Sequence, residues 1–269
     1  MPTQTATRRT PVVFIHGLWM HSDSWKNWVD LFREAGYDAI APGWPGDSAT
    51  VADANAHPER VANVGIDAAV EHYAQILRGL DPKPIVVGHS FGGLIAQKLL
   101  GMGLASAAVA IAPAQIRGVL PLPLAQLKSA LPVLGNPLNY KRAVPQTAKQ
   151  FHSGFANAVS EQESNELFGK YAIPAPGRPL FEAAFANVFP NTPAKVNVTA
   201  DRGPLLIIGG GKDRTVPEVV TRAAHKLYRK AKTVNEYKVF PDRGHSVTID
   251  RGWKEVANTS LGWLRGKGL

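Results

Sequence analysis

Residues 84–100, PIVVGHSFGGLIAQKLL, place a serine between an apolar run and a stretch with helical spacing. Ser90 has one glycine two residues before it, Gly88, and another two residues after it, Gly92. A serine that presents its hydroxyl at the tip of a strand-to-helix turn must take a strained backbone conformation, and side chains at the two glycines would collide across so tight a bend. The following helix adds N–H groups and the positive end of its dipole, which favour developing negative charge. The stretch is therefore typical of a nucleophile elbow.

Short apolar runs alternate with helical patterns along most of the chain, which favours a parallel sheet covered by helices. The expected strands are 12–15, 37–41, 85–87, 107–112, 205–208 and 236–240. The expected helices lie over 25–32, 66–80, 94–100, 217–230 and 253–264. The sequence thus predicts an α/β fold with a mostly parallel sheet of about six strands and helices on both faces.

The alternation stops between residues 117 and 203, where ten prolines occur among leucine, alanine and phenylalanine. This segment is too apolar for a disordered linker. We expect it to form a helical cap over the mouth of the sheet, inserted into a hydrolase-like core of residues 1–116 and 204–269.

Two further residues complete the predicted chemistry of the serine. A serine hydroxyl is a poor nucleophile unless a base takes its proton and a third group orients that base. Asp213 and His245 each follow a predicted strand, and the carboxyl ends of parallel strands gather at one edge of a sheet. We therefore predict Ser90 as the nucleophile, Asp213 as the acid and His245 as the base, with Asp242 as the alternative acid.

The tetrahedral intermediate of acyl transfer also needs hydrogen-bond donors for its oxyanion. One predicted donor is the N–H of Phe91, directly after the serine. The other is the N–H of Leu18, in the loop after the first strand, with Trp19 as the alternative. Trp19 and Trp44 are predicted to line the substrate pocket; simple packing is the competing interpretation of both.

The composition excludes several classes of function. The net charge of +9 comes from basic residues spread along all 269 positions, with no dense run and no nucleic-acid motif. The chain has no cysteine, and its eight histidines lack metal-ligand spacing, so no metal site is expected. The apolar run 11–16 is too short for a signal peptide or a membrane span, which predicts a cytoplasmic protein without a membrane partner.

The acidic residues are distributed unevenly. Between Asp81 and Glu161 there is no Asp or Glu, whereas seven Lys or Arg residues occur. The loop after the fourth predicted strand therefore cannot supply the acid of the triad.

The motifs of this chain resemble those of the α/β-hydrolase superfamily, and most of all those of its esterase and cofactor-free haloperoxidase branch. The matching positions are 16–17, 41–46, the elbow around Ser90, 213–217 and His245. The resemblance implies a Ser–His–Asp hydrolase that acts on a small apolar ester, needs no cofactor and carries a cap between its fourth and fifth strands.

Other activities on the same scaffold stay open, because a fold does not choose its chemistry. They are a lactonase, a carbon–carbon bond hydrolase, a perhydrolase or haloperoxidase, a hydroxynitrile lyase, and a ligand receptor without activity. Gly43 also departs from the family, whose members often have aspartate at that position.

Overall fold

A six-stranded sheet forms the centre of the computed structural model, which describes residues 9–269. The first eight residues of the predicted core therefore lie outside the described residues. The strands run parallel in the order β2-β1-β3-β4-β7-β8. Their bounds are β1 Pro11–Ile15, β2 Asp38–Ile40, β3 Ile85–His89, β4 Ala107–Ile111, β7 Leu205–Gly210 and β8 Asn235–Phe240. The predicted α/β fold and its six strands are confirmed.

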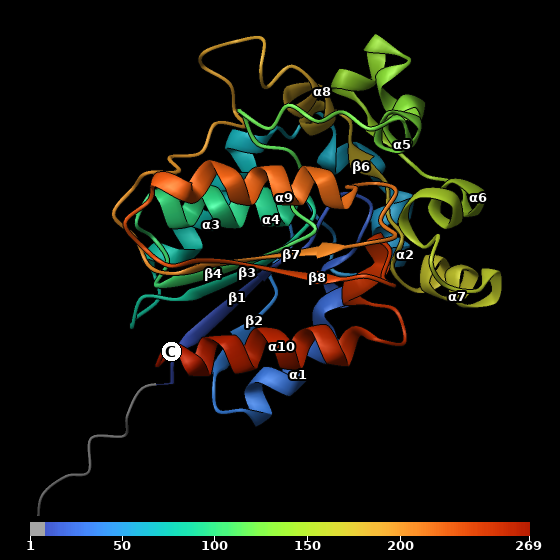
Figure 1. Cartoon of the computed structure of the whole chain (residues 1–269). Coiled ribbons are helices and arrows are strands. Elements are labelled where there is room, and N and C mark those ends of the chain that lie inside the picture. The colour runs from blue at the N-terminus through green and yellow to red at the C-terminus, as the bar shows by residue number, and fades with distance from the viewer. Residues whose placement is uncertain (1–8) are drawn as a thin grey trace, which may run out of the picture.

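Helices cover both faces of this sheet, as Figure 1 shows. One face packs on α3 (Ile66–Arg78), α4 (Phe91–Gly101) and α9 (Glu218–Leu227), and the other on α1 (Lys26–Glu34) and α10 (Trp253–Gly266). Successive residues of a strand point to opposite faces, so Val13 packs with the first group and Val12 with the second. The four central strands β1, β3, β4 and β7 are buried along their whole length and are mostly apolar, because helices cover both of their faces. The edge strands β2 and β8 are partly exposed and carry polar residues.

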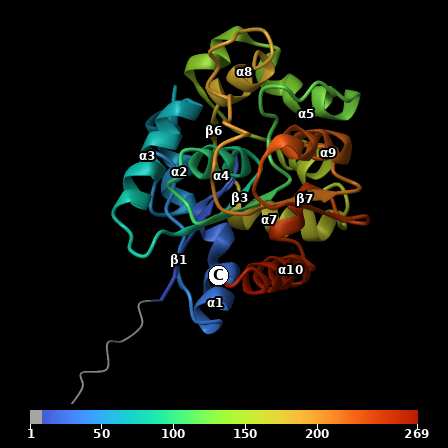
Figure 2. The same ribbon diagram turned by 60° about the vertical axis from the view of Figure 1, so that its left-hand side comes forward.

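The segment between β4 and β7 forms a separate layer, which we call the insertion (residues 117–203). Figures 1 and 2 both place α5 and α8 at the end of the molecule beyond α3, α4 and α9, away from α1 and α10. The helices of the insertion are α5 Leu124–Leu134, α6 Ala148–Gln150, α7 Glu161–Tyr171 and α8 Arg178–Ala184. It also contains the 3-10 turn η3 Pro137–Lys141 and the π-helical turn η4 Phe151–Phe155.

The insertion contains two short strands as well as its helices. Two short strands, β5 (Ala143–Val144) and β6 (Ala175–Pro176), pair antiparallel within it. The loop after β1 adds to this layer, because Met20 forms an isolated antiparallel bridge with Ala172. Backbone pairing between segments so far apart in the sequence leaves no local pattern to detect.

The remaining elements are short. They are α2 Val51–Ala56 and the 3-10 turns η1 Ser22–Trp25, η2 Pro58–Val61, η5 Tyr228–Lys230 and η6 His245–Thr248. Within residues 9–269, none of the helices combines the length and apolar character required to cross a bilayer.

Candidate active site

Ser90 occupies the turn between β3 and α4 with φ +55° and ψ −120°. A positive φ is uncommon for a residue with a side chain, and such strain persists only where the surroundings hold it. Here the Ser90 N–H donates to the carbonyl of Ile111 at 2.9 Å, and the Ala114 N–H donates to the Ser90 carbonyl at 2.8 Å. The end of β4 thus holds the strained serine in place.

The two glycines around Ser90 are needed for space. A Cβ at Gly88 would lie 2.1 Å from the Gly92 carbonyl oxygen, which is the collision expected across the bend. A Cβ at Gly92 would instead meet the carbonyl oxygen of Ile15 at 2.1 Å. Gly92 therefore allows α4 to approach the end of β1. The sequence predicted a collision across the turn for both glycines, whereas the structure places the collision of Gly92 against β1.

His245 and Asp213 meet at the carboxyl ends of β8 and β7. The His245 Nδ1–H donates to Asp213 Oδ2 at 2.7 Å, and both side chains are buried. The other oxygen, Oδ1, accepts from the N–H groups of Thr215 at 2.8 Å and Val216 at 2.7 Å. With Nδ1 carrying the proton, the Nε2 of His245 is left as the basic nitrogen.

Asp242, the alternative acid, lies elsewhere. Its carboxylate forms an ion pair with Lys212 at 3.0 Å and is 86% exposed. The structure therefore brings Asp213 rather than Asp242 to His245.

The loop after β1 lies against the elbow. A Cβ at Gly17 would be 2.7 Å from the Ser90 Cβ, so only glycine permits this approach. Leu18, the next residue, lines the same cavity as Ser90 and Phe91. Phe91 is the first residue of α4, where an N–H group has no partner within the helix.

Trp19 connects this loop to the insertion. It has φ +64° and lines the cavity, and its Nε1–H donates to the carbonyl of Val144 at 2.9 Å.

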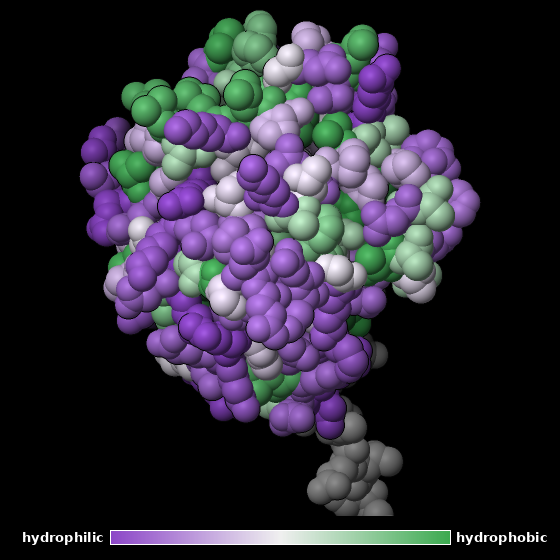
Figure 3. Space-filling view, turned by 90° about the vertical axis from the view of Figure 1, so that its right-hand side faces the viewer, coloured by the Kyte–Doolittle hydropathy of each residue, from purple (hydrophilic) through white to green (hydrophobic). Residues whose placement is uncertain are grey.

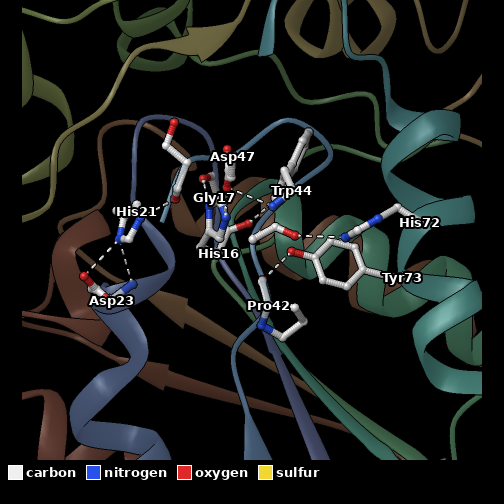
Figure 4. Close-up of polar contacts among 11 residues, drawn as sticks. His16, Gly17, His21, Asp23, Pro42, Trp44, Asp47, His72 and Tyr73 are labelled. Atoms are coloured by element: carbon white, nitrogen blue, oxygen red, sulfur yellow. Dashed lines mark hydrogen bonds and ion pairs between the residues drawn. The ribbon is translucent and has the colours of Figure 1, made fainter. Parts of the chain in front are cut away.

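A buried network supports the loop after β1 (Figure 4). His16 Nε2 donates to Asp47 Oδ2 at 2.8 Å, and the Trp44 N–H donates to the same oxygen at 2.8 Å. Asp47 thus supplies a carboxylate four residues after Gly43, the position where family members often have aspartate. A Cβ at Gly43 would lie 2.7 Å from the Asp47 Cβ, so the glycine makes room for this carboxylate.

The loop after β2, which contains Gly43, Trp44 and Asp47, is held in turn from α3. The Tyr73 hydroxyl donates to the Pro42 carbonyl at 2.9 Å, and His72 Nε2 donates to the Gly43 carbonyl at 3.1 Å. Asp47 has no motif around it, so sequence reasoning missed its role.

We expect Asp47→Ala to lower the free energy of unfolding by about 2–3 kcal/mol, because it leaves the buried donors of His16 and Trp44 without an acceptor. Urea unfolding measures the change. Asp30→Ala is the control, since its ion pair with Lys26 is exposed and is worth at most about 1 kcal/mol. Equal losses in the two variants would contradict the structural role of Asp47.

His89 supports the histidine of the site. Its Nε2–H donates to the carbonyl of His245 at 2.9 Å, and the two ring centroids lie 4.6 Å apart. Burial, followed by the neighbouring His245, holds the pKa of His89 well below its usual 6.5. His89 is therefore neutral in the folded protein.

This low pKa predicts a loss of stability on acidification. Below about pH 6.5 the unfolded chain binds a proton at His89 that the folded protein does not, so the free energy of unfolding falls by up to about 1.4 kcal/mol per pH unit from this residue. The measurement compares the pH dependence of urea unfolding in wild type and His89→Asn. The wild type should show the steeper slope below pH 6.5; parallel slopes would contradict the prediction.

A cavity of about 590 Å³ opens beside Ser90 and His245. Most of its lining comes from the insertion and is apolar, including Leu134, Phe155 and Leu180. The two cations in the lining are Lys128 and Arg214, and none of the lining residues is a carboxylate.

Two of the four glutamines in the cavity lining have a side-chain oxygen without a hydrogen-bond partner among the described residues. Gln126 and Gln146 belong to the lining, and the side-chain oxygen of each is buried without a hydrogen-bond partner among residues 9–269. Both residues, like Phe155, were missed at the sequence level because no motif marks them.

Trp44 requires a correction. It does not belong to the lining of the cavity that contains Ser90. Its indole Nε1–H donates to the His16 carbonyl at 3.0 Å, and its ring packs beside that of His16. The competing interpretation, packing, therefore applies to Trp44, whereas Trp19 does line the cavity.

The described part of the chain, residues 9–269, contains no group of three or more His, Cys, Asp or Glu side chains arranged to hold a metal ion.

A family model described as the alpha/beta hydrolase family matches residues 12–259. A comparison with curated proteins finds no match.

Solved structures of similar fold cover almost the whole chain. A monoacylglycerol lipase from Paleococcus ferrophilus is 19% identical with a TM-score of 0.65, over 96% of each chain. A methylesterase from Arabidopsis is 19% identical with a TM-score of 0.63, over 95% of this chain and 99% of that one. A protein of Mycobacterium tuberculosis described as a candidate non-heme bromoperoxidase is 22% identical with a TM-score of 0.60, over 96% and 92%. At these identities the likeness concerns the fold alone.

Proposed function

This chain belongs to the alpha/beta hydrolase family, and on that premise we propose that it is a serine hydrolase that cleaves carboxylic esters through an acyl-enzyme. One observation carries the proposal: Ser90 and His245 line the same apolar cavity, and His245 is hydrogen-bonded to the buried Asp213. A nucleophile, a base and a group that orients the base are the parts that acyl transfer requires.

The reaction has two halves. In the first, the Oγ of Ser90 attacks the ester carbonyl carbon while its proton passes to Nε2 of His245. The N–H groups of Leu18 and Phe91 hold the oxyanion, and His245 then protonates the leaving alcohol as the intermediate collapses. In the second half, His245 takes a proton from water as the water oxygen attacks the acyl carbon. The bond from the acyl carbon to Ser90 Oγ then breaks, His245 returns the proton to Oγ, and the carboxylic acid leaves. Asp213 stays ionised throughout and keeps the imidazole oriented.

The cavity supports an ester with a sizeable apolar group. Its volume of about 590 Å³ falls within the usual range of small-molecule sites, and its lining is mainly aliphatic and aromatic. The unpaired oxygens of Gln126 and Gln146 favour a substrate that also carries a hydrogen-bond donor, since a buried acceptor without a partner costs free energy. We propose that the insertion, with the predicted bounds 117–203, acts as the cap that forms this pocket.

A panel of nitrophenyl esters of increasing acyl length tests the proposal. We expect kcat/KM to rise at least about tenfold from acetate to the best chain, because each added methylene in an apolar pocket is worth about 1–3 kcal/mol. Lactones and carbon–carbon bond substrates should turn over more slowly. Turnover of none of the esters would contradict the proposed activity.

The variant Ala183→Trp connects this preference to the cavity. Ala183 lies on α8 and lines the cavity, so the larger side chain should remove the advantage of long acyl chains while acetate keeps its rate within about threefold. An unchanged chain-length profile would assign the acyl site to another part of the molecule.

A further inference from the structure

The exposed apolar side chains are concentrated on the insertion. Of the twelve large apolar residues that are exposed among residues 9–269, nine belong to this segment: Leu120, Leu122, Leu124, Leu127, Leu131, Leu138, Phe185, Val188 and Phe189. Figure 3 shows hydrophobic residues gathered at the top of the molecule, the end that α5 and α8 form in Figure 1. Single exposed apolar residues are normal, whereas a group of them on one segment marks an interaction site.

Helix α5 presents its leucines to solvent. Leu124, Leu127 and Leu131 follow helical spacing along one side and are 75%, 40% and 63% exposed. The helix buries only Val133. A helix of a globular protein normally turns such a stripe toward the core, so the exposed stripe of α5 lacks a partner among residues 9–269.

The exposed surface continues into the cavity. Leu122 and Leu127 are exposed and also line the cavity that contains Ser90. These two leucines therefore form an apolar connection between the exposed surface near α5 and the cavity.

The charges around this surface are positive. Lys128 lies on α5, and Lys141 and Arg142 follow it at the end of η3, all three of them exposed. No Asp or Glu occurs between residues 82 and 160. On the adjacent α8, Glu182 is buried and forms an ion pair with Arg178 at 2.8 Å.

We propose that the exposed leucines of α5 and the surrounding cations form a docking surface for an anionic lipid–water interface. Leucine and phenylalanine side chains insert at the boundary of headgroups and acyl chains, and lysine and arginine are attracted to negatively charged lipids. A two-fold contact with a second copy is disfavoured, because it would bring the same cations face to face. This surface departs from the expectation of no membrane partner and does not depend on the proposed hydrolysis.

Vesicle flotation tests the docking surface. The protein carries Ser90→Ala, so that turnover cannot alter the lipid, and the vesicles contain either phosphatidylcholine with phosphatidylglycerol or phosphatidylcholine alone. We expect binding to the anionic vesicles, weaker binding to the neutral ones, and a decrease as salt screens the lysines and arginines. Absence of binding to the anionic vesicles would overturn the proposal.

A matched pair of double variants assigns the binding to α5. Leu124→Ser with Leu131→Ser should lower the partition into anionic vesicles at least about tenfold, since apolar burial sets much of the affinity. Neither leucine lines the cavity, so the activity of the corresponding Ser90 enzyme on a soluble ester should be retained. Met102→Ser with Val234→Ser removes two exposed apolar residues that precede β4 and β8, and should bind as before.

Light scattering tests whether a second copy of this chain covers the surface instead of a lipid interface. We expect the protein to keep the mass of a monomer at the concentrations used for flotation. A dimer that is lost in the α5 double variant would assign the surface to a second copy and overturn the proposal, as would equal vesicle binding by the two double variants.

Discussion

Ser90→Ala is expected to lower kcat for ester hydrolysis by about 10⁶-fold, because it removes the atom that forms the acyl-enzyme. The same change should abolish covalent labelling by a fluorophosphonate. Removal of one hydroxyl should leave the circular dichroism spectrum of the protein unchanged. The measurement pairs steady-state kinetics on a soluble ester with labelling and mass analysis of the modified peptide.

Ser129→Ala is the matched control for the nucleophile. Ser129 lines the same cavity, and its hydroxyl donates to the Arg214 carbonyl at 3.3 Å. This variant should retain labelling and activity within about tenfold, the cost of a neutral hydrogen bond. Turnover by Ser90→Ala above about a thousandth of the wild-type rate would rule out Ser90 as the nucleophile, since binding and the oxyanion donors alone sustain little more.

Asp213→Asn is expected to reduce kcat by about 10⁴-fold. An amide at this position can donate to Nδ1 of His245, which stabilises the tautomer with the proton on Nε2 and so removes the base. The N–H groups of Thr215 and Val216 still find the side-chain oxygen as acceptor, so the loop should keep its conformation. Stopped-flow or steady-state kinetics, together with an unfolding curve, separates the loss of rate from a loss of stability.

Asp242→Asn is the control for the acid. Asp242 is exposed and pairs with Lys212, a contact that is worth at most about 1 kcal/mol to stability. We expect its activity to stay close to that of wild type. A larger loss in Asp242→Asn than in Asp213→Asn would move the acid of the triad to Asp242.

The three residues of the proposed triad could be placed from the sequence because each depends on local signals. A strand buried on both faces is a short apolar run, and side chains that follow such runs in a parallel sheet gather at one edge. Ser90, Asp213 and His245 could therefore be assigned to one site before any contact between them was known. The strain at Ser90 was equally accessible, since the glycines at positions 88 and 92 indicate a tight turn by themselves.

The sequence did not allow us to assign residues whose role depends on contacts between loops that are far apart in the chain. Trp44 was predicted to line the pocket, but its hydrogen bonds to the carbonyl of His16 and the carboxylate of Asp47 hold it outside the cavity that contains Ser90. Asp47, four residues after Gly43, accepts hydrogen bonds from His16 and from the Trp44 N–H. Spacing along the chain does not reveal that His16, after β1, and Asp47, after β2, lie in contact.

The surface of the insertion also depends partly on the local sequence and partly on tertiary packing. The leucine spacing of α5 indicates a helix with one apolar side, and the sequence by itself determines that much. Whether that side faces the core or the solvent is decided by tertiary packing, which buries Val133 and leaves Leu124 and Leu131 exposed. The local period of a helix fixes which residues share a face, whereas only the arrangement of the other elements determines what that face contacts.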